Sequence, residues 1–230
     1  MSGWSQLFRS SIGMKMIMAA TGAGIVLFAI AHMLGNLQIY LGQDALNGYA
    51  KKLKDLPELL WVARAGLITI FVMHIGTAFR LVGMNRAARP VKYKKQKPQE
   101  TNLASRTLIF SGVVLLAFVI FHLAHFTLGK THPDQFHLTD AAGRQDVFSM
   151  VVLGFQDPLV SGFYILAMAA LGFHLWHAVA SIFQSIGWAH PRYRPLFEKL
   201  GKGITTLLVI GNISIPAAVL AGVIKLPAGG

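Results

Sequence analysis

Five long runs of apolar residues constrain this chain more than any other feature of its sequence. A helix that crosses the hydrocarbon core of a membrane needs roughly 20 mostly apolar residues. Runs that meet this requirement lie at about 14–41, 59–83, 107–129, 159–188 and 204–224. One such run could be a buried helix of a soluble protein, but five of this length favour membrane spans. The sequence therefore predicts an all-α integral membrane bundle of five transmembrane helices, forming one domain over residues 1–230.

The composition limits the metal chemistry that the chain can support. Hydrophobic residues make up 54% of it and charged residues 13%, whereas a soluble domain carries about a quarter charged residues. There is no cysteine, which excludes disulfides, thiolate metal sites and cysteine-held iron–sulfur clusters. Any metal would have to be held by histidine, of which there are nine.

The basic residues predict the orientation of the bundle. A net charge of +12 could indicate nucleic acid, but in a membrane protein it first reports topology, and we expect no nucleic-acid partner. One side of the predicted membrane carries 14 basic residues and two acidic ones, and the other carries six and seven. The 14 are Arg9, Lys15, Arg80, Arg86, Arg89, Lys92, Lys94, Lys95, Lys97, Arg106, Arg192, Arg194, Lys199 and Lys202. Since basic loops remain in the cytoplasm, the amino terminus is predicted to be cytoplasmic and the carboxyl terminus outside. The same loops could dock a cytoplasmic partner or anionic lipid.

Histidines are the main ionisable residues inside the predicted spans. Each of the first four spans carries a histidine past its midpoint. In chain order these are His32, His74, His122 and His174. Because successive spans run in opposite directions, His32 and His122 are predicted to lie toward the outside, and His74 and His174 toward the cytoplasm. The two levels should be on the order of 10 Å apart at 1.5 Å per helical residue.

Two imidazoles that face each other across a bundle suit a six-coordinate haem iron, whose other four ligands come from the porphyrin. A single membrane histidine can equally be a hydrogen-bonded helix contact, but four at matched depths weaken that interpretation. A proton relay would normally include carboxylates, and the span interiors hold no Asp or Glu. The histidines of the loops, His132, His137 and His190, are expected to be solvated.

The first and third spans share a local pattern. Thr21-Gly22 precedes His32 by the same eleven positions as Ser111-Gly112 precedes His122. Eleven residues make about three helical turns, so the hydroxyl and the histidine share a face. We expect the hydroxyls and glycines to lie at the inner level, where glycine would let a flat macrocycle approach the backbone. Small residues for helix packing are the other interpretation of the glycines.

Two arginines are candidates for binding haem propionates. Arg64 lies inside the second span near its outer surface, and a guanidinium can bind a carboxylate bidentately. Arg106 sits at the inner edge of the third span, where extension of the side chain to the interface accounts for it as well.

These residues together resemble the two-haem, single-chain cytochrome b subunit of succinate:quinone oxidoreductases, the family of succinate dehydrogenases and fumarate reductases. The resemblance rests on four motifs in this order over nearly the whole chain. They are Thr21-Gly22 through His32-Met33, Ala63-Arg64 through His74, Ser111-Gly112 through His122-Leu123, and Phe173-His174 through Gly187-Trp188.

The resemblance implies an anchor subunit of the cell inner (cytoplasmic) membrane that carries two b haems. Flavoprotein and iron–sulfur subunits would bind its cytoplasmic face, and a higher oligomer of the complex stays open. Electrons would pass between succinate or fumarate and a membrane quinone, commonly menaquinone in this class. The ligands would be His32 with His122 and His74 with His174, which leaves His125 and His177 as non-ligands. Some members carry a proton-transferring glutamate where this chain has Gly172, so that route is in doubt here.

Other functions remain open from the sequence. One is that of a two-haem quinone-reactive cytochrome in a nitrate reductase, hydrogenase or formate dehydrogenase. Those families, however, distribute the haem ligands differently over their helices. A haem-free transporter or channel is another. For a quinone, the candidate residues are Glu58, Trp61 and Arg64, which lie near the outer start of the second span, roughly on one side of the helix. An N-terminal helix acid with an interfacial tryptophan anchor explains them as well.

Overall fold

The computed structural model describes residues 10–87, 108–188 and 190–227, apart from the side chain of His177. Over these residues the fold is helical, with one isolated β-bridge between Thr139 and Gln145. The long helices are α2 (Ser11–Asn36), α4 (Pro57–Ala87), α6 (Leu108–His122), α9 (Pro158–Ser185) and α10 (Arg194–Leu220). A 3-10 turn η1 (Leu37–Leu41) extends α2, and a π turn η2 (Leu123–Thr127) extends α6. The short helices are α3 (Gln43–Lys54), α7 (Pro133–Phe136) and α8 (Val147–Gln156).

Five of the described helices are long and apolar enough to cross a membrane. Each contains most of one predicted apolar run, so the predicted all-α fold with five spans is confirmed. The largest difference is at the start of α10, which begins at Arg194 rather than near residue 204. Its first turns carry charged residues, which hydropathy alone excludes from a span, but Pro195 suits the first turn of a helix. The chain thus has the architecture of a multi-pass membrane protein.

Local sequence signals explain where the long helices begin. The Ser10 side chain accepts a hydrogen bond from the Gly13 N–H at 3.0 Å and caps α2. The Asp157 carboxylate accepts from the N–H groups of Leu159 and Val160 and caps α9, which has Pro158 in its first turn. These caps satisfy backbone donors that have no partner inside the helix.

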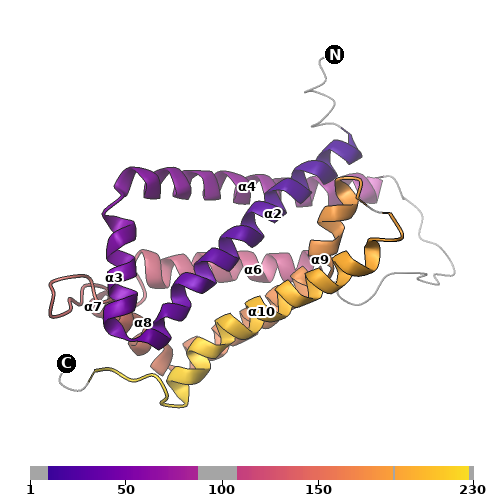
Figure 1. Cartoon of the computed structure of the whole chain (residues 1–230). Coiled ribbons are helices and arrows are strands. Elements are labelled where there is room, and N and C mark those ends of the chain that lie inside the picture. The colour runs from indigo at the N-terminus through magenta and orange to yellow at the C-terminus, as the bar shows by residue number, and fades with distance from the viewer. Residues whose placement is uncertain (1–9, 88–107, 189, 228–230) are drawn as a thin grey trace.

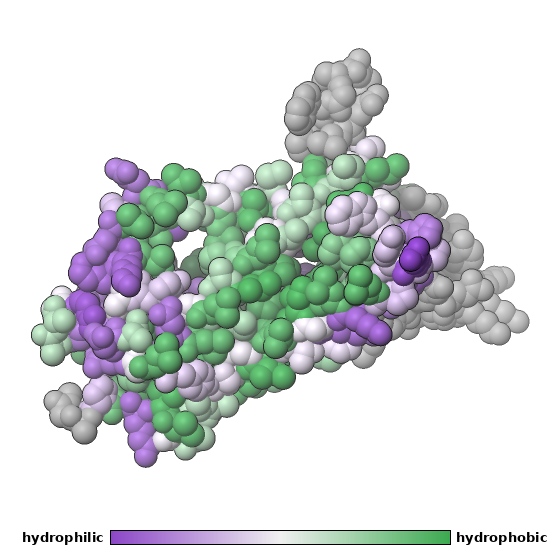
Figure 2. All heavy atoms as spheres, in the orientation of Figure 1, coloured by the Kyte–Doolittle hydropathy of each residue, from purple (hydrophilic) through white to green (hydrophobic). Residues whose placement is uncertain are grey.

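The long helices run between two ends of the molecule (Figure 1). The first residues of α2, α6 and α10 and the last residues of α4 and α9 gather at one end, called here the amino-terminal end. The short helices α3, α7 and α8 lie at the other, called here the α3–α8 end. Figure 2 shows hydrophilic residues at both ends and a hydrophobic belt between them. This distribution is what a membrane-spanning bundle requires, because lipid surrounds only the middle of the helices.

The packing between the helices is uneven. α2 and α9 form the centre: α2 packs on α4, α9 and α10, and α9 also packs on α6 and α10. Among the described residues, α4 makes its extensive contacts with α2 alone and has no more than incidental ones with α6 or α9. The apolar middle of α4 has none of its residues buried inside the protein. Figure 2 accordingly shows openings between α4 and the helices next to it.

A buried polar network closes the α3–α8 end. Asn47 of α3 is 0% exposed and donates to Asp140 at 3.1 Å and to Asp146 at 2.9 Å. Its carbonyl oxygen accepts from the Phe148 N–H at 2.9 Å. The Asp140 carboxylate also accepts from the Arg144 guanidinium at 2.7 Å. This network ties α3 to α8 and to the loop before α8, so it fixes the connections of the spans at this end.

Candidate functional site

The four predicted ligand histidines meet in two pairs. The imidazoles of His32 and His122 lie 5.7 Å apart between ring centroids and are nearly perpendicular, at 86°. We call them the outer pair, after their predicted depth. His74 and His174, the inner pair, are close enough that a charge on one would act on the other. Each pair therefore brings together the two histidines that the sequence assigned to one level.

Both pairs join helices that make little direct contact with each other. The outer pair links α2 to α6, and the inner pair links α4 to α9, and neither combination of helices packs extensively among the described residues. The His32 and His122 imidazoles therefore meet where the backbones of α2 and α6 stay apart.

The Thr21-Gly22 and Ser111-Gly112 motifs contact the inner pair in the same way. Thr21 Oγ1 lies 3.2 Å from His74 Nδ1, and Ser111 Oγ lies 3.2 Å from His174 Nδ1. A Cβ added to Gly22 would lie 3.3 Å from His74 Cε1, and one added to Gly112 would lie 3.5 Å from His174 Cε1. The glycines thus make room for imidazoles, whereas the sequence pattern suggested room for a macrocycle. The small-residue motif and the histidine of the neighbouring span form one local unit, which occurs twice.

The hydrogen bonds of these units fix the tautomer of each inner histidine. Thr21 Oγ1 donates its proton to the Ile17 carbonyl at 2.7 Å, so toward His74 it acts as an acceptor. Ser111 Oγ likewise donates to the Leu108 carbonyl, at 3.1 Å. With the hydroxyl protons on these carbonyls, the inner histidines carry their own proton on Nδ1, and Nε2 keeps its lone pair. A neutral imidazole held in this way is the usual form of a histidine metal ligand.

The outer histidines have different partners, which sequence reasoning missed. Asn36 Nδ2 lies 3.1 Å from His32 Nε2 and donates to it. The Tyr164 hydroxyl lies 3.3 Å from His122 Nδ1. Asn36 follows His32 by four positions and could have been found from helix geometry. Tyr164 lies 42 positions from His122, so no local spacing indicates it.

The contacts of α2 locate the two levels along that helix. The inner histidine His74 lies level with Thr21, and the outer histidine His122 lies level with His32. Eleven residues of α2 separate these levels, which correspond to about 16 Å along the helix axis. The vertical separation of about 10 Å stays a prediction, because α2 runs obliquely to α4 and α6 (Figure 1) and a distance along its axis exceeds the vertical one.

The remaining histidines fall into distinct environments. His125, in the π turn, is 3% exposed, and its Nε2 has no hydrogen-bond partner. His132 is not simply solvated as the sequence suggested, because its Nδ1 is buried without a partner and its ring lies 5.2 Å from that of His125. His137 and His190 are exposed, and the side chain of His177 lies outside the described part of the chain.

The residues predicted to bind propionates or a quinone lie along one exposed strip of α4. The Arg64 guanidinium lies over the Trp61 ring, 5.3 Å from its centroid, and Glu58 lies one turn before Trp61. The protein leaves all three side chains exposed. Arg64 lies inside the predicted second span, but the protein does not bury it. Arg106, the second predicted propionate residue, lies outside the described residues.

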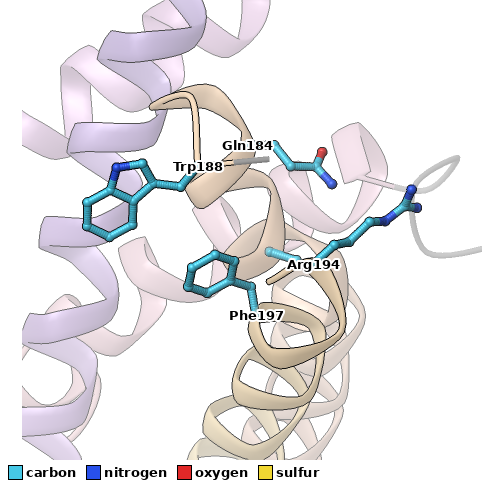
Figure 3. A pocket seen from close by; sticks show the side chains of 5 residues that line it. Gln184, Trp188, Arg194 and Phe197 are labelled. Atoms are coloured by element: carbon cyan, nitrogen blue, oxygen red, sulfur yellow. The ribbon is translucent and has the colours of Figure 1, made fainter. Parts of the chain in front are cut away.

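Two hollows lie near the amino-terminal end. One is an open depression of about 220 Å³ between α2 and α4, lined by Met14, Ile17, Met73, Gly76, Thr77 and Arg80. Arg80, which lines this depression, follows His74 on α4 by less than two helical turns. The other, between the end of α9 and the start of α10, is drawn in Figure 3 with Gln184, Trp188, Arg194 and Phe197 around it. At about 10 Å³ it admits no more than a water molecule.

Comparisons with known proteins add no identification. No protein-family model, curated protein or solved structure matches this chain. The function therefore has to be argued from the geometry of the histidine pairs.

Proposed function

We propose that this chain is a dihaem cytochrome b that anchors a succinate dehydrogenase or fumarate reductase complex in the inner membrane. Its role is to pass electrons between an iron–sulfur subunit and a membrane quinone, for which menaquinone is the proposed species. The observation that carries the proposal is the repeated unit in which a hydroxyl contacts Nδ1 of an imidazole and a glycine lies beside its ring.

The residues present fit two haems. Two imidazoles are the protein's full share of the ligands of a six-coordinate haem iron. Pairs of imidazoles suit a metal whose other positions a macrocycle fills. The described residues leave openings beside α4 (Figure 2), the helix that carries His74. When bound, haem supplies one-electron transfer without an open coordination position.

Each side chain then has a defined role. His74 and His174 hold the inner haem, and His32 and His122 hold the outer one. Asn36 occupies His32 Nε2 in this structure, so it has to release that nitrogen when His32 binds iron. Arg80 at the inner level and Arg64 near the α3–α8 end are placed to pair with propionates.

The proposed partners bind at opposite ends of the bundle. Arg86, Arg192 and Lys199 lie at the amino-terminal end, the proposed cytoplasmic face and docking surface for the iron–sulfur and flavoprotein subunits. The quinone is proposed to bind near the α3–α8 end, beside Glu58, Trp61 and Arg64. Glu58 would accept a proton at this site, since quinol oxidation releases protons together with electrons.

Proton transfer through the level of Gly172 is not part of this proposal. A Cβ added to Gly172 would lie 3.1 Å from Val209 Cγ2. α10 therefore approaches α9 closely at Gly172. A larger side chain at this position would have to displace the Val209 side chain.

The test is the haem content of the purified protein and of four ligand variants. A pyridine haemochrome assay should give two b haems per chain. His74→Ala and His174→Ala should each remove the inner haem, while His32→Ala and His122→Ala each remove the outer one. One haem or none in the unaltered chain would reject the proposal.

Two further measurements separate the other functions. Co-purification of an iron–sulfur protein and a flavoprotein distinguishes this proposal from a cytochrome of a nitrate reductase, hydrogenase or formate dehydrogenase. A missing reduced-minus-oxidised haem spectrum would instead favour a transporter or channel.

A further inference from the structure

One tyrosine hydroxyl connects the outer pair to a buried histidine that the proposed function leaves without a role. Tyr164 Oη lies 3.3 Å from His122 Nδ1 and 3.2 Å from His125 Nδ1. Tyr164 is 7% exposed and His125 is 3% exposed, so water has little access to these contacts. The three side chains come from α9, from the last residue of α6 and from the π turn that follows it.

The geometry prevents His125 itself from being a ligand. Its Nδ1 faces Tyr164, and a Cβ added to Gly154 would lie only 3.0 Å from its Nε2. The ring also stacks on Phe126, with centroids 3.9 Å apart and planes at 22°. Both nitrogens are thus enclosed by protein. A buried polar atom without a partner, such as this Nε2, is rare and calls for an explanation.

The single proton of the Tyr164 hydroxyl couples the tautomers of the two histidines. If Tyr164 donates to His125 Nδ1, its oxygen accepts from His122 Nδ1–H, and His122 Nε2 keeps a lone pair. If Tyr164 donates to His122 Nδ1 instead, the His122 proton moves to Nε2, which can then no longer bind a metal. The first arrangement requires His125 to carry its own proton on Nε2, so that its Nδ1 can accept the Tyr164 proton.

We propose that Tyr164 and His125 are positioning residues that set His122 in its metal-binding tautomer and tune the outer haem. This inference rests on the proposed function. His125 acts through Tyr164, and Tyr164 acts on the nitrogen of His122 that faces away from the iron. At the inner level the hydroxyls of Thr21 and Ser111 need no such helper, because backbone carbonyls of their own helices take their protons.

The arrangement has a consequence for the redox potential. A hydrogen bond accepted from the Nδ1–H of a ligand imidazole raises the basicity of the ligand, which favours the oxidised iron. Loss of that acceptor should therefore raise the midpoint potential of the haem. Tyr164 contacts only the outer pair, so the inner haem serves as an internal reference in the same molecule.

The experiment is a redox titration of both haems in the purified, assembled complex. In Tyr164→Phe we expect two haems, a raised midpoint potential for the outer one and an unchanged potential for the inner one. The corresponding variant at the inner level, Thr21→Val, should raise the midpoint potential of the inner haem and leave that of the outer haem unchanged. Electron paramagnetic resonance of the oxidised outer haem should change in Tyr164→Phe alone.

Variants of His125 test the coupling of the tautomers. His125→Leu removes the acceptor, so Tyr164 turns its proton toward His122 and outer-haem content should fall. His125→Asn offers an amide oxygen in place of Nδ1 and should retain the outer haem. Adding Tyr164→Phe to His125→Leu should restore outer-haem content, because the competing donor is gone.

The outcomes separate this inference from the proposed function. A chain without two haems in its unaltered form rejects the function and this inference together. Two haems with unchanged potentials in Tyr164→Phe, or full outer-haem content in His125→Leu, would reject the inference alone. Loss of both haems in Tyr164→Phe would also reject it, since only the outer level should respond.

Discussion

The position of one proton decides what each inner histidine can do. His74 and His174 each have one nitrogen against a hydroxyl whose own proton is bonded to a backbone carbonyl. When Nδ1 carries the proton of the ring, the other nitrogen keeps a lone pair. Orientation of a ligand by its hydrogen-bond partner commonly changes metal affinity by about 10–100-fold. The hydroxyl residues are therefore expected to matter nearly as much as the histidines.

The glycine beside His74 gives a residue-scale prediction. In Gly22→Val the added methyl groups would overlap the imidazole, since even a Cβ would lie 3.3 Å from His74 Cε1. We expect selective loss of the inner haem, measured by the haemochrome assay and by redox titration of the remaining haem. The matched control is Gly66→Val on α4, where an added Cβ meets nothing within 4 Å. Equal haem loss in both variants would show a general effect of β-branching in a helix.

A second residue-scale prediction concerns Asn36. Its amide occupies the His32 nitrogen that iron would need, so Asn36→Ala should keep two haems and make His32 Nε2 more accessible. Spectroscopic titration with added haem should show outer-level affinity equal to or above that of the unaltered chain. A loss of the outer haem would mean that Asn36 supports ligation and that His32 binds through another arrangement.

At the scale of elements, the contact between α3 and α8 closes the bundle opposite the amino-terminal end. This contact is made by buried polar groups. They are Asn47 and the carboxylates of Asp140 and Asp146, to which Asn47 donates hydrogen bonds. The Gln43 amide also donates to Asp146, at 2.8 Å. Such a network specifies one docking geometry, and it becomes costly when a member is lost.

Asn47→Ala should therefore destabilise the protein by about 1–3 kcal/mol, the usual cost of leaving a buried polar group unpaired. The measurement is thermal or denaturant unfolding in detergent. Lys51→Ala is the control, because it breaks an ion pair whose side chains are 54% and 56% exposed, and exposed pairs contribute about 0–1 kcal/mol. Similar effects of the two variants would contradict a special role for the network.

The same network gives a pH dependence. Burial raises the pKa of Asp140, but hydrogen bonds from the Arg144 backbone and guanidinium and from Asn47 outweigh it and lower the pKa to about 2. Because the pKa is lowered by folding, the carboxylate stabilises the fold above its ordinary pKa of 3.8. This contribution is lost as pH falls from about 4 to about 2. Unfolding curves over this range should show the loss in the unaltered chain and a weaker one in Asp140→Asn.

At the scale of the whole molecule, two polar ends separated by an apolar belt require that one end face each side of the membrane (Figure 2). The proposed orientation places the amino-terminal end in the cytoplasm. The absence of cysteine makes the chain suitable for single-cysteine labelling with a reagent that does not cross membranes.

We expect Arg86→Cys and Lys199→Cys to be labelled from the cytoplasmic side, and Lys52→Cys from the outside. In sealed right-side-out vesicles only Lys52→Cys should react before permeabilisation. Labelling of all three positions from one side would contradict a spanning bundle, and the reverse pattern would invert the orientation. Crosslinks to an iron–sulfur subunit should form on the side of the membrane from which Lys199→Cys is labelled.

The sequence by itself determined the five spans, because hydropathy is a property of each segment and lipid demands a minimum length. It also determined which histidines share a level, since helix rise converts position into depth. Only the tertiary structure decided the partner of each imidazole nitrogen, because that depends on how helices rotate and pack. Tyr164 and His122 are 42 positions apart, and Thr21 and His74 are 53 apart. The roles of Tyr164 and His125 follow from those contacts, which no spacing in the sequence could predict.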